Sequence, residues 1–470
     1  MLNGDHIPMT RDLELEKKNS SQKNNDKVSF NYKSSKLIIN GTLVEVTQQE
    51  PILSVYYKLK KANLSLTEIA NILFKHKEGQ VRQKMYSQNF YTEQGSEAET
   101  NVINNDKEAT YCILWCINHY TGLNRNKNVI EAGIEASKAY GTGSGTSALS
   151  CGHSSLHKQV EEKISTFIGK ETCLFFPTGY STNVGALSAL CTADDLIIFD
   201  RECHASIIDG VKLSGATYYS FKHNNVKNLE KKLKLFKGKY KNIFVLVESS
   251  YSMSGDLCPL SEIAALKEEY PFYLYVDEAH TFGFYGTKGA GFCESLNLTD
   301  KVDFIMSTLS KATASLGGFI ACDEIYRPLL EWKANAYIFQ AACSPFDAAV
   351  VLKSLEVIET TPGIQESIHN NNNYMRVLLN KAGFDLGESK SPVIPIRIPN
   401  DQLLQKISIE LYKHHIFTVS VIYPAVKNGQ GLLRFIVTAN HTKEQIDYTV
   451  STLSKLCKQY QVIPEAIIGR

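Results

Sequence analysis

The stretch PFYLYVDEAHTFGFYG, residues 271–286, decides the fold of the chain. It opens with a short apolar run and then changes abruptly to an acid and an imidazole, Asp277 and His280. A second run of the same kind, DFIMSTLSK at 303–311, ends in Lys311. Short apolar runs separated by helical patterns are typical of parallel strands that are buried on both faces of a sheet.

The same alternation continues on both sides of this stretch. Further strand-like runs are ETCLFF (171–176), DLIIFD (195–200), TYYSF (217–221), NIFVLVE (242–248) and FIACDE (319–324), and helical patterns begin at Ser181 and cover 205–215, 226–236 and 261–270. This pattern predicts an α/β fold with a doubly wound, mostly parallel sheet in a large domain, residues 109–345. A helical stretch at 344–359 leads into a smaller C-terminal α/β domain, residues 346–470, with strands in PVIPIRI and GLLRFIVTA and a closing helix at 444–460.

Residues 1–108 form an N-terminal extension to this pattern. Its first 35 residues are polar and predict a flexible arm. KLIINGTLVEV at 36–46 predicts a hairpin that turns at Asn40-Gly41. Ser65 and Glu68 form a capping box for a helix that runs to Phe74, and a polar stretch follows to residue 108. The role of this extension is open: a docking site for a carrier protein or membrane surface and an ordinary solvated face are both compatible with it.

Composition excludes several functional classes. The 470 residues carry 50 Lys and Arg against 49 Asp and Glu, a net charge of +1, which gives no long-range field for nucleic acid. The 11 scattered cysteines include no Cys-x-x-Cys pair, so we expect free thiols, no metal site and a cytoplasmic location. No apolar run is long enough for a transmembrane segment, and the N-terminus lacks the apolar core of a signal peptide.

Polar side chains collect where the predicted strands end. They are His204, Asp277, His280, Thr308, Lys311 and the small-residue turn Thr178-Gly179-Tyr180. Ligands of open α/β sheets bind at the carboxyl ends of the strands, so these groups are expected at one rim. Together they suit pyridoxal 5′-phosphate: a lysine amine for its aldehyde, a carboxylate for its pyridine nitrogen, and a turn before a helix for its phosphate.

Each of these residues also has an ordinary structural interpretation. An aspartate after a strand often caps a helix, a lysine in a loop is usually solvent-facing, and Thr178-Gly179 is compatible with a simple turn. The sequence GTGSGT at 141–146 is a weak phosphate-binding signal because no strand directly precedes it. The joint occurrence of the groups, in order and at strand ends, favours the cofactor site.

Residues 109–460 resemble the α-oxoamine synthases, pyridoxal phosphate enzymes of aminotransferase fold type I, and are most similar to the bacterial serine palmitoyltransferase-like members. The matching blocks are ILWCINHYTGL (113–123), GTGSGTSALSCGHSSLHKQVEEKI (141–164), FFPTGYSTNVGALSAL (175–190), CHASIIDGVKLSGA (203–216), ESSYSMSGDLCPL (248–260), YVDEAHTFGFYGTKGAG (275–291), STLSKATASLGGFIA (307–321) and LLRFIVTANHT (432–442).

The resemblance implies a role for each matching position. Lys311 would form the Schiff base and move protons at the substrate α-carbon, Asp277 would hold the pyridine nitrogen, and His204 would stack on the ring. The implied contacts of the remaining groups are with the ring's phenolic oxygen (His280 and Ser252), with the phosphate (Thr308 and Thr178-Gly179-Tyr180) and with the amino acid carboxylate (Asn118 and Arg434). An arginine suits a carboxylate because its fork donates two parallel hydrogen bonds.

The implied reaction is a decarboxylating condensation of a small amino acid, serine first, with a long-chain acyl-CoA or acyl carrier protein thioester. Its product would be an α-amino ketone such as 3-ketosphinganine. Alternatives are glycine or alanine as the amino acid, another acyl group, or a non-catalytic scaffold paralogue, although the intact lysine, acid and imidazole argue against the scaffold. The resemblance also implies a homodimer with active sites at the subunit interface.

The chain departs from the family pattern at four places, which the resemblance puts near where the substrate and the thioester would bind. The usual Gly-Gly-Ser-Arg turn reads Gly145-Thr146-Ser147-Ala148, so an arginine is missing. The segment YIFQAACSP, residues 337–345, also differs from the common form. The Asn-Asp-Tyr-Leu-Gly block reads NHYTG at 118–122, and Cys203 stands where Asn is common.

Overall fold

The computed structural model describes residues 28–31, 36–39, 42–46, 50, 52–62, 64–82, 90–93, 98–104, 107–398, 400–423, 425–427 and 429–463. The chain divides into two compact units, residues 1–83 and 84–470. Of the predicted flexible arm, residues 1–27 and 32–35 lie outside the described residues.

The first unit contains a three-stranded antiparallel sheet and two helices. The strands are β1 (Val28–Asn31), β2 (Lys36–Ile39) and β3 (Thr42–Glu45), and the helices are α1 (Ile52–Lys60) and α2 (Leu66–Arg82). Pairing of β2 with β3 confirms the predicted hairpin, although its turn lies outside the described residues. The capping box is present, because the Ser65 N–H donates to Glu68 and the Glu68 N–H donates to Ser65 Oγ. The helix continues eight residues past Phe74, so the predicted polar stretch begins as helix.

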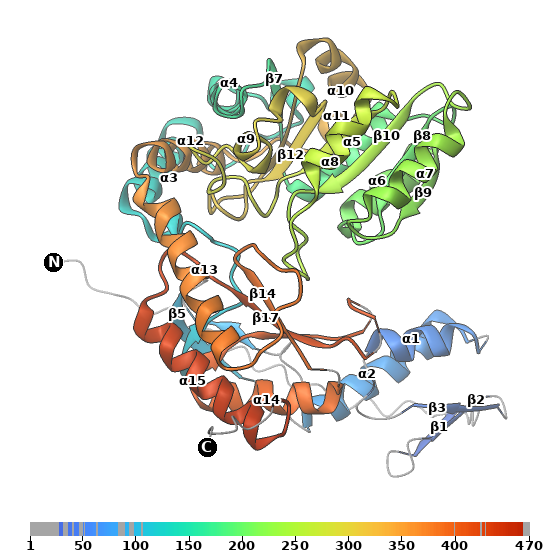
Figure 1. Ribbon diagram of the computed structural model, residues 1–470, viewed down its shortest axis with the longest axis vertical. Helices are drawn as coiled ribbons and strands as arrows, with labels where there is room; N and C mark the ends of the chain where they lie inside the picture. Colours follow the sequence, from blue (N-terminus) through green and yellow to red (C-terminus); the bar gives the residue numbers. More distant parts are fainter. Residues whose placement is uncertain are drawn as a thin grey trace, which may run out of the picture. The chain divides into compact units, whose positions relative to one another are not determined.

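A seven-stranded sheet is the largest sheet of the second unit, and Figure 1 labels several of its strands. Its order is β7-β13-β12-β11-β10-β8-β9. The strands are β7 (Thr172–Phe176), β8 (Leu196–Asp200), β9 (Thr217–Phe221), β10 (Ile243–Glu248), β11 (Tyr273–Asp277), β12 (Phe304–Thr308) and β13 (Gly318–Cys322). Strands β8 to β12 are parallel, whereas β13 is antiparallel to both β12 and β7. The prediction of a mostly parallel sheet is therefore confirmed, and β13 is the strand that runs against the others.

Successive residues of these strands face two separate hydrophobic cores, as the alternation of side chains along a strand requires. One core joins Val245, Val247 and Val276 to helices α4 (Ser155–Ile168), α7 (Val226–Phe236), α8 (Leu260–Ala265) and α12 (Pro345–Thr360). The other joins Phe244 and Leu246 to α5 (Gly179–Leu190), α6 (Ala205–Ser214), α10 (Arg327–Lys333) and α11 (Asn335–Ile338). Helices on both faces make this a doubly wound α/β fold. Edge strand β9 is the exception, because the middle of its length is exposed.

Two smaller sheets complete the second unit. One has the order β14-β17-β16 and the other β15-β6-β5-β4. Their strands are β4 (Tyr91–Thr92), β5 (Glu99–Ile103), β6 (Ala109–Leu114), β14 (Val393–Arg397), β15 (Ile416–Phe417), β16 (Val419–Val421) and β17 (Leu432–Ile436). Helices α13 (Gly363–Lys381), α14 (Asp401–Lys413) and α15 (Lys443–Gln459) share a core with β14 and β17. The remaining helices are α3 (Lys127–Tyr140) and α9 (Phe292–Ser295).

All eleven cysteines fall within the described residues and are free thiols. Among the residues that the structure describes, no group of three or more His, Cys, Asp or Glu side chains is arranged to hold a metal ion. No helix in the described ranges combines the length and apolar character needed to cross a membrane.

Candidate active site

The carboxyl ends of β10, β11 and β12 bring two acids and a threonine to one rim of the sheet. Glu248 ends β10 and is in register with Asp277 at the end of β11, and Thr308 ends β12. Both acids are buried. Asp277 accepts hydrogen bonds from the Ala279 N–H (2.9 Å) and from Asn183 Nδ2 (2.9 Å). Burial, and then the neighbouring Asp277, raise the pKa of Glu248 well above its usual range.

Lys311 lies three residues beyond the end of β12 and carries an amine without a partner. The amine makes no hydrogen bond or ion pair with the residues that the structure describes, whereas the Lys311 carbonyl accepts from the Ala314 N–H. Burial lowers the pKa of Lys311 to about 8, against the opposing attraction of Asp277 and Glu248. Such an amine has a much larger neutral fraction near neutral pH than an ordinary lysine, and its neutral form is a nucleophile that can attack a carbonyl.

His204 is the N-cap residue of α6 and lies at the same rim. Its backbone N–H donates to Glu248, and its Nδ1 accepts from the Ser206 N–H (3.3 Å) and lies 2.8 Å from Ser206 Oγ. Loss of solvent around the imidazole lowers its pKa although the residue as a whole is exposed. The ring of Tyr180 lies edge-on to this imidazole, with 6.4 Å between the two ring centroids. The Tyr180 hydroxyl donates to Asp209.

His280 is buried and pairs with Tyr120, a residue that sequence reasoning did not single out. The hydroxyl of Tyr120 lies 2.7 Å from His280 Nδ1. Burial, with Lys311 and Arg434 nearby, lowers the pKa of His280 well below its usual range. The imidazole is therefore neutral near neutral pH, with a hydroxyl that fixes its orientation.

Thr178, Gly179 and Thr308 form a tight cradle at the N-terminus of α5. Thr178 is the N-cap residue and its hydroxyl accepts from the Ser181 N–H at 3.0 Å. A Cβ on Gly179 would lie 2.5 Å from Thr308 Cβ and 2.8 Å from its Oγ1, so no larger residue fits. Helix N-termini with small residues bind phosphate because their backbone N–H groups are unpaired and face a positive dipole end.

Arg434, Asn118 and Ser252 converge from three distant parts of the chain. Nε of Arg434 donates to the Ser252 carbonyl at 2.6 Å, and its Nη2 donates to Asn118 Oδ1 at 3.3 Å. Thus Ser252 contributes its carbonyl group to this cluster. Burial lowers the pKa of Arg434, yet an arginine remains charged. No hydrogen bond within the described residues engages Nη1, which leaves donor capacity for an anion.

These groups fit pyridoxal 5′-phosphate. The tight cradle around Gly179 suits the phosphate, the unpaired Lys311 amine suits the aldehyde, and the buried Asp277 suits a protonated ring nitrogen. When bound, this cofactor supplies a ring that accepts the electron pair left at a substrate carbon.

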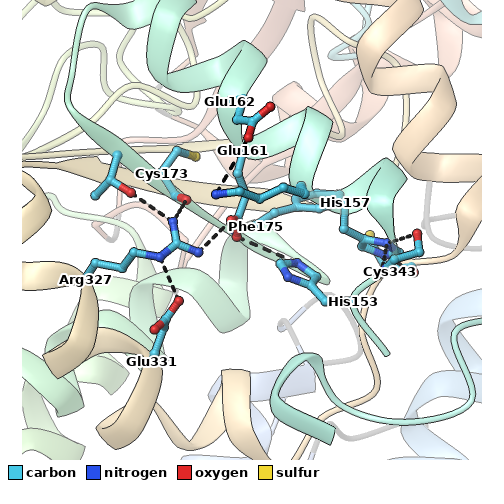
Figure 2. Close-up of polar contacts among 12 residues, drawn as sticks. His153, His157, Glu161, Glu162, Cys173, Phe175, Arg327, Glu331 and Cys343 are labelled. Carbon is cyan, nitrogen blue, oxygen red and sulfur yellow. Dashed lines mark hydrogen bonds and ion pairs between the residues drawn. The ribbon is translucent and has the colours of Figure 1, made fainter. Parts of the chain in front are cut away.

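A partly buried ion pair links α10 and α4 beside the start of β7 (Figure 2). Arg327 Nη2 lies 2.7 Å from Glu161 Oε2. The same carboxylate accepts from the Phe175 N–H of β7 at 3.1 Å. Burial lowers the pKa of nearby His153 to about 4, so its 3.7 Å contact with Glu161 is not an ion pair at neutral pH. We infer that these contacts hold α4 and α10 against β7 and therefore stabilise the fold.

Two of the segments that depart from the family pattern, at 145–148 and 337–345, lie side by side. Ser147 forms a bridge with Ala341, and the Ala342 N–H donates to the Thr146 carbonyl at 3.0 Å. The Cys343 carbonyl accepts from the Ser144 hydroxyl and lies 2.8 Å from His157 Nε2 (Figure 2). We call residues 144–148 and 341–343 the paired segments.

Sequence reasoning missed three buried polar residues: Tyr120, Asn183 and Glu248. Asn183 follows Gly179 by one helical turn, so helix periodicity places it on the same face as the cradle. Glu248 ends a strand and could have been found by the same strand-end rule as Asp277.

The fold and site define a fold type I pyridoxal phosphate enzyme. Residues 110–453 match the family model described as aminotransferase class I and II, and the chain belongs to that family. Within it, this chain is an α-oxoamine synthase family member, an acyltransferase with pyridoxal phosphate as its cofactor.

Relatives and solved structures agree with this assignment. A serine palmitoyltransferase of Bacteroides thetaiotaomicron is 36% identical over 79% of this chain and 92% of its own. An 8-amino-7-oxononanoate synthase of Alkaliphilus oremlandii is 34% identical over 74% of this chain and 88% of its own. The structure of Sphingomonas wittichii serine palmitoyltransferase superposes with a TM-score of 0.80 and 27% identity, covering 85% of this chain and 100% of that one.

Proposed function

We propose that this enzyme condenses a small amino acid, serine first, with a long-chain acyl thioester and releases carbon dioxide and the thiol. The product would be an α-amino ketone such as 3-ketosphinganine. The observation that carries the proposal is the convergence of Arg434 and Asn118 on one cluster, within the same unit as Lys311 and Asp277. Relatives named serine palmitoyltransferase, 36–38% identical, support serine as the amino acid.

The site residues would divide the work as follows. Arg434 and Asn118 bind the carboxylate of the amino acid, and Lys311 Nζ removes the proton from its α-carbon. Asp277 holds the ring nitrogen of the cofactor protonated, and the His204 imidazole covers the ring. His280 with Ser252 lies near the phenolic oxygen, while Thr308 and the turn Thr178-Gly179-Tyr180 bind the phosphate.

A second candidate is the condensation of glycine or alanine with a different acyl group. It is favoured by relatives named 8-amino-7-oxononanoate synthase at 32–34% identity, and by Ala148 where the family usually has an arginine. An arginine beside the substrate would bind an anionic group, so its loss alters the choice of thioester or acyl chain.

Titration of the holoenzyme with serine, glycine and alanine tests the choice of amino acid. The true substrate should change the visible spectrum of the bound cofactor at the lowest concentration. Mass spectrometry of products formed from a panel of acyl-CoA and acyl carrier protein thioesters then gives the chain length and the carrier. Serine with a long-chain acyl group is expected. A spectral change with no product from any thioester would support a non-catalytic scaffold.

We further propose that the enzyme is a cytoplasmic homodimer with active sites at the subunit interface, as the family resemblance implies. Light scattering of the purified protein would give twice the mass of one chain. A stable monomer with full activity would contradict the dimer. Fractionation of cells would show whether the protein accompanies cytoplasmic markers or membranes.

A further inference from the structure

One buried amide connects two of the groups assigned to the cofactor. Asn183 lies on α5 and is 1% exposed. Its Nδ2 donates to Asp277 Oδ2 at 2.9 Å and to Ser206 Oγ at 2.9 Å. Its Oδ1 accepts from the Tyr275 hydroxyl at 2.7 Å. Both N–H donors and one carbonyl lone pair are thus in use.

The partners of this amide fix its orientation. An ionised carboxylate only accepts hydrogen bonds, so the nitrogen must face Asp277. The Tyr275 hydroxyl then donates to the oxygen on the other side. Tyr275 is fully buried, and burial, with Asp277 nearby, raises its pKa well above the usual range, so this hydroxyl stays protonated and remains a donor.

The second hydrogen bond that Asn183 donates, to Ser206, connects the amide to the His204 imidazole at the rim of the sheet. Since the Ser206 N–H donates to His204 Nδ1, that nitrogen is an acceptor. The Ser206 hydroxyl also lies 2.8 Å from Nδ1, and donates to it while accepting from Asn183. The proton of the neutral His204 ring is therefore on Nε2, and every bond in the chain from Asn183 runs toward Nδ1.

We propose that Asn183 is a positioning residue that aligns Asp277 with the ring nitrogen of pyridoxal phosphate and, through Ser206, sets the tautomer of His204. This inference rests on the proposed roles of Asp277 and His204. It assigns a second task to α5, whose N-terminus forms the phosphate cradle and whose second turn orients the acid and the imidazole. A hydrogen bond to the ionised form of Asp277 favours that form, which a protonated ring nitrogen requires.

Three variants separate two branches: the hydrogen bond from Asn183 to Asp277, and the path from Asn183 through Ser206 to His204. Asn183→Leu keeps the approximate shape and removes both branches. Ser206→Ala removes only the hydroxyl that links Asn183 to His204 and keeps the Ser206 N–H that donates to His204 Nδ1. Tyr275→Phe removes only the hydroxyl that orients the amide. A matched control is Asn372→Leu on α13, because Asn372 is also a buried amide, with bonds to Lys390 and Arg376 instead.

The measurements are the dissociation constant of added pyridoxal phosphate and the pH titration and circular dichroism of its visible band. Asn183→Leu should bind the cofactor about tenfold more weakly, because Asp277 loses a donor. Its band should titrate at a different pH from that of the wild type. Ser206→Ala should leave the pH titration unchanged and alter the circular dichroism. Asn372→Leu should lower thermal stability without changing the band.

Unchanged cofactor affinity and an unchanged band in Asn183→Leu would overturn the proposal. If that variant does not fold, a Tyr275→Phe band identical to the wild type in both pH titration and circular dichroism would overturn it equally. Failure of the wild type to bind pyridoxal phosphate would instead contradict the proposed function. The two failures are therefore distinguishable without any assay of product.

Discussion

Arg434 and Asn118 lie 316 positions apart in the sequence, yet Nη2 of the arginine donates to Oδ1 of the asparagine at 3.3 Å. The Ser252 carbonyl holds Nε of the same guanidinium at 2.6 Å. Two of the three guanidinium nitrogens of Arg434 are thus bound by the protein, so the guanidinium is oriented before any substrate binds. A preoriented arginine loses less side-chain entropy when it binds a carboxylate.

Arg434→Ala should therefore raise the KM for the amino acid by about ten- to hundredfold, because charge-assisted hydrogen bonds are lost. Arg434→Lys should keep the positive charge but lose the planar guanidinium, and its KM should lie between that of the wild type and that of Arg434→Ala. Arg397→Ala, at the exposed end of the neighbouring strand β14, is the control. Steady-state kinetics with each amino acid measures the effect. Unchanged kinetics in Arg434→Ala would remove this residue from the carboxylate site.

Gly179→Ala should weaken binding of pyridoxal phosphate, because the new Cβ would lie 2.5 Å from Thr308 Cβ. Such overpacking costs about 1–3 kcal/mol. Gly363→Ala is a matched control, since its Cβ would meet nothing within 4 Å at the start of helix α13. Equilibrium titration with the cofactor should show a loss of affinity only for the first variant. Equal affinities would mean that the phosphate does not bind at this cradle.

The pKa of Lys311, about 8, predicts how capture of the cofactor depends on pH. Only the neutral amine attacks an aldehyde, so the rate should rise as pH increases toward 8 and level off above it. Stopped-flow absorbance of apoprotein mixed with pyridoxal phosphate measures this rate. The rate for a free lysine amine, which has a pKa near 10.4, should keep rising until the pH exceeds that value. Lys311→Ala should give no covalent visible band at any pH; a variant that stays yellow and active would overturn the assignment.

His223 predicts a loss of stability in alkali. It lies between Asp200 (3.0 Å) and Asp256 (3.1 Å). Burial alone would lower its pKa, but hydrogen bonds to these two acids outweigh burial and raise it to about 9. A pKa raised by folding stabilises the protein fully below the unfolded value near 6.5, and the stabilisation is lost as pH rises through 9.

Thermal unfolding from pH 6 to 10 tests this sign. His223→Gln should unfold at a lower temperature than the wild type at pH 6. The difference should shrink above pH 9, where the wild-type imidazole is neutral. His414→Gln, at an exposed position, should follow the wild type throughout. A constant difference for His223→Gln at every pH would mean that charge is not the cause.

Most of the central sheet could be predicted from the sequence, because buried strands require short apolar runs. The prediction of a mostly parallel sheet left open which strand reverses, and the sequence carries a clue: only nine residues, 309–317, join β12 to β13. A parallel connection needs a crossover of a dozen residues or more, so this loop permits only the antiparallel return. Strand β9 looked buried from its aromatic residues, but it is an edge strand and exposes Tyr218 and Tyr219, while Phe221 is buried.

The candidate site was predictable where residues follow the end of a strand, as Asp277 and Lys311 do. Asn183 was not, because it lies inside a helix and a polar residue there usually faces solvent. Its importance depends on Asp277 and Ser206, which only the tertiary fold places beside it. Tyr120 was also missed because only the tertiary fold reveals its partner, His280, which lies 160 positions away in the sequence.

The paired segments have a consequence for engineering. Residues 144–148 and 341–343 are joined by backbone contacts and by the shared Cys343 carbonyl, so neither can be reshaped alone without leaving polar groups of the other unsatisfied. A chimera that borrows one of them from a relative should fold poorly or lose activity, whereas transplanting both as one cassette should transfer the donor's preference.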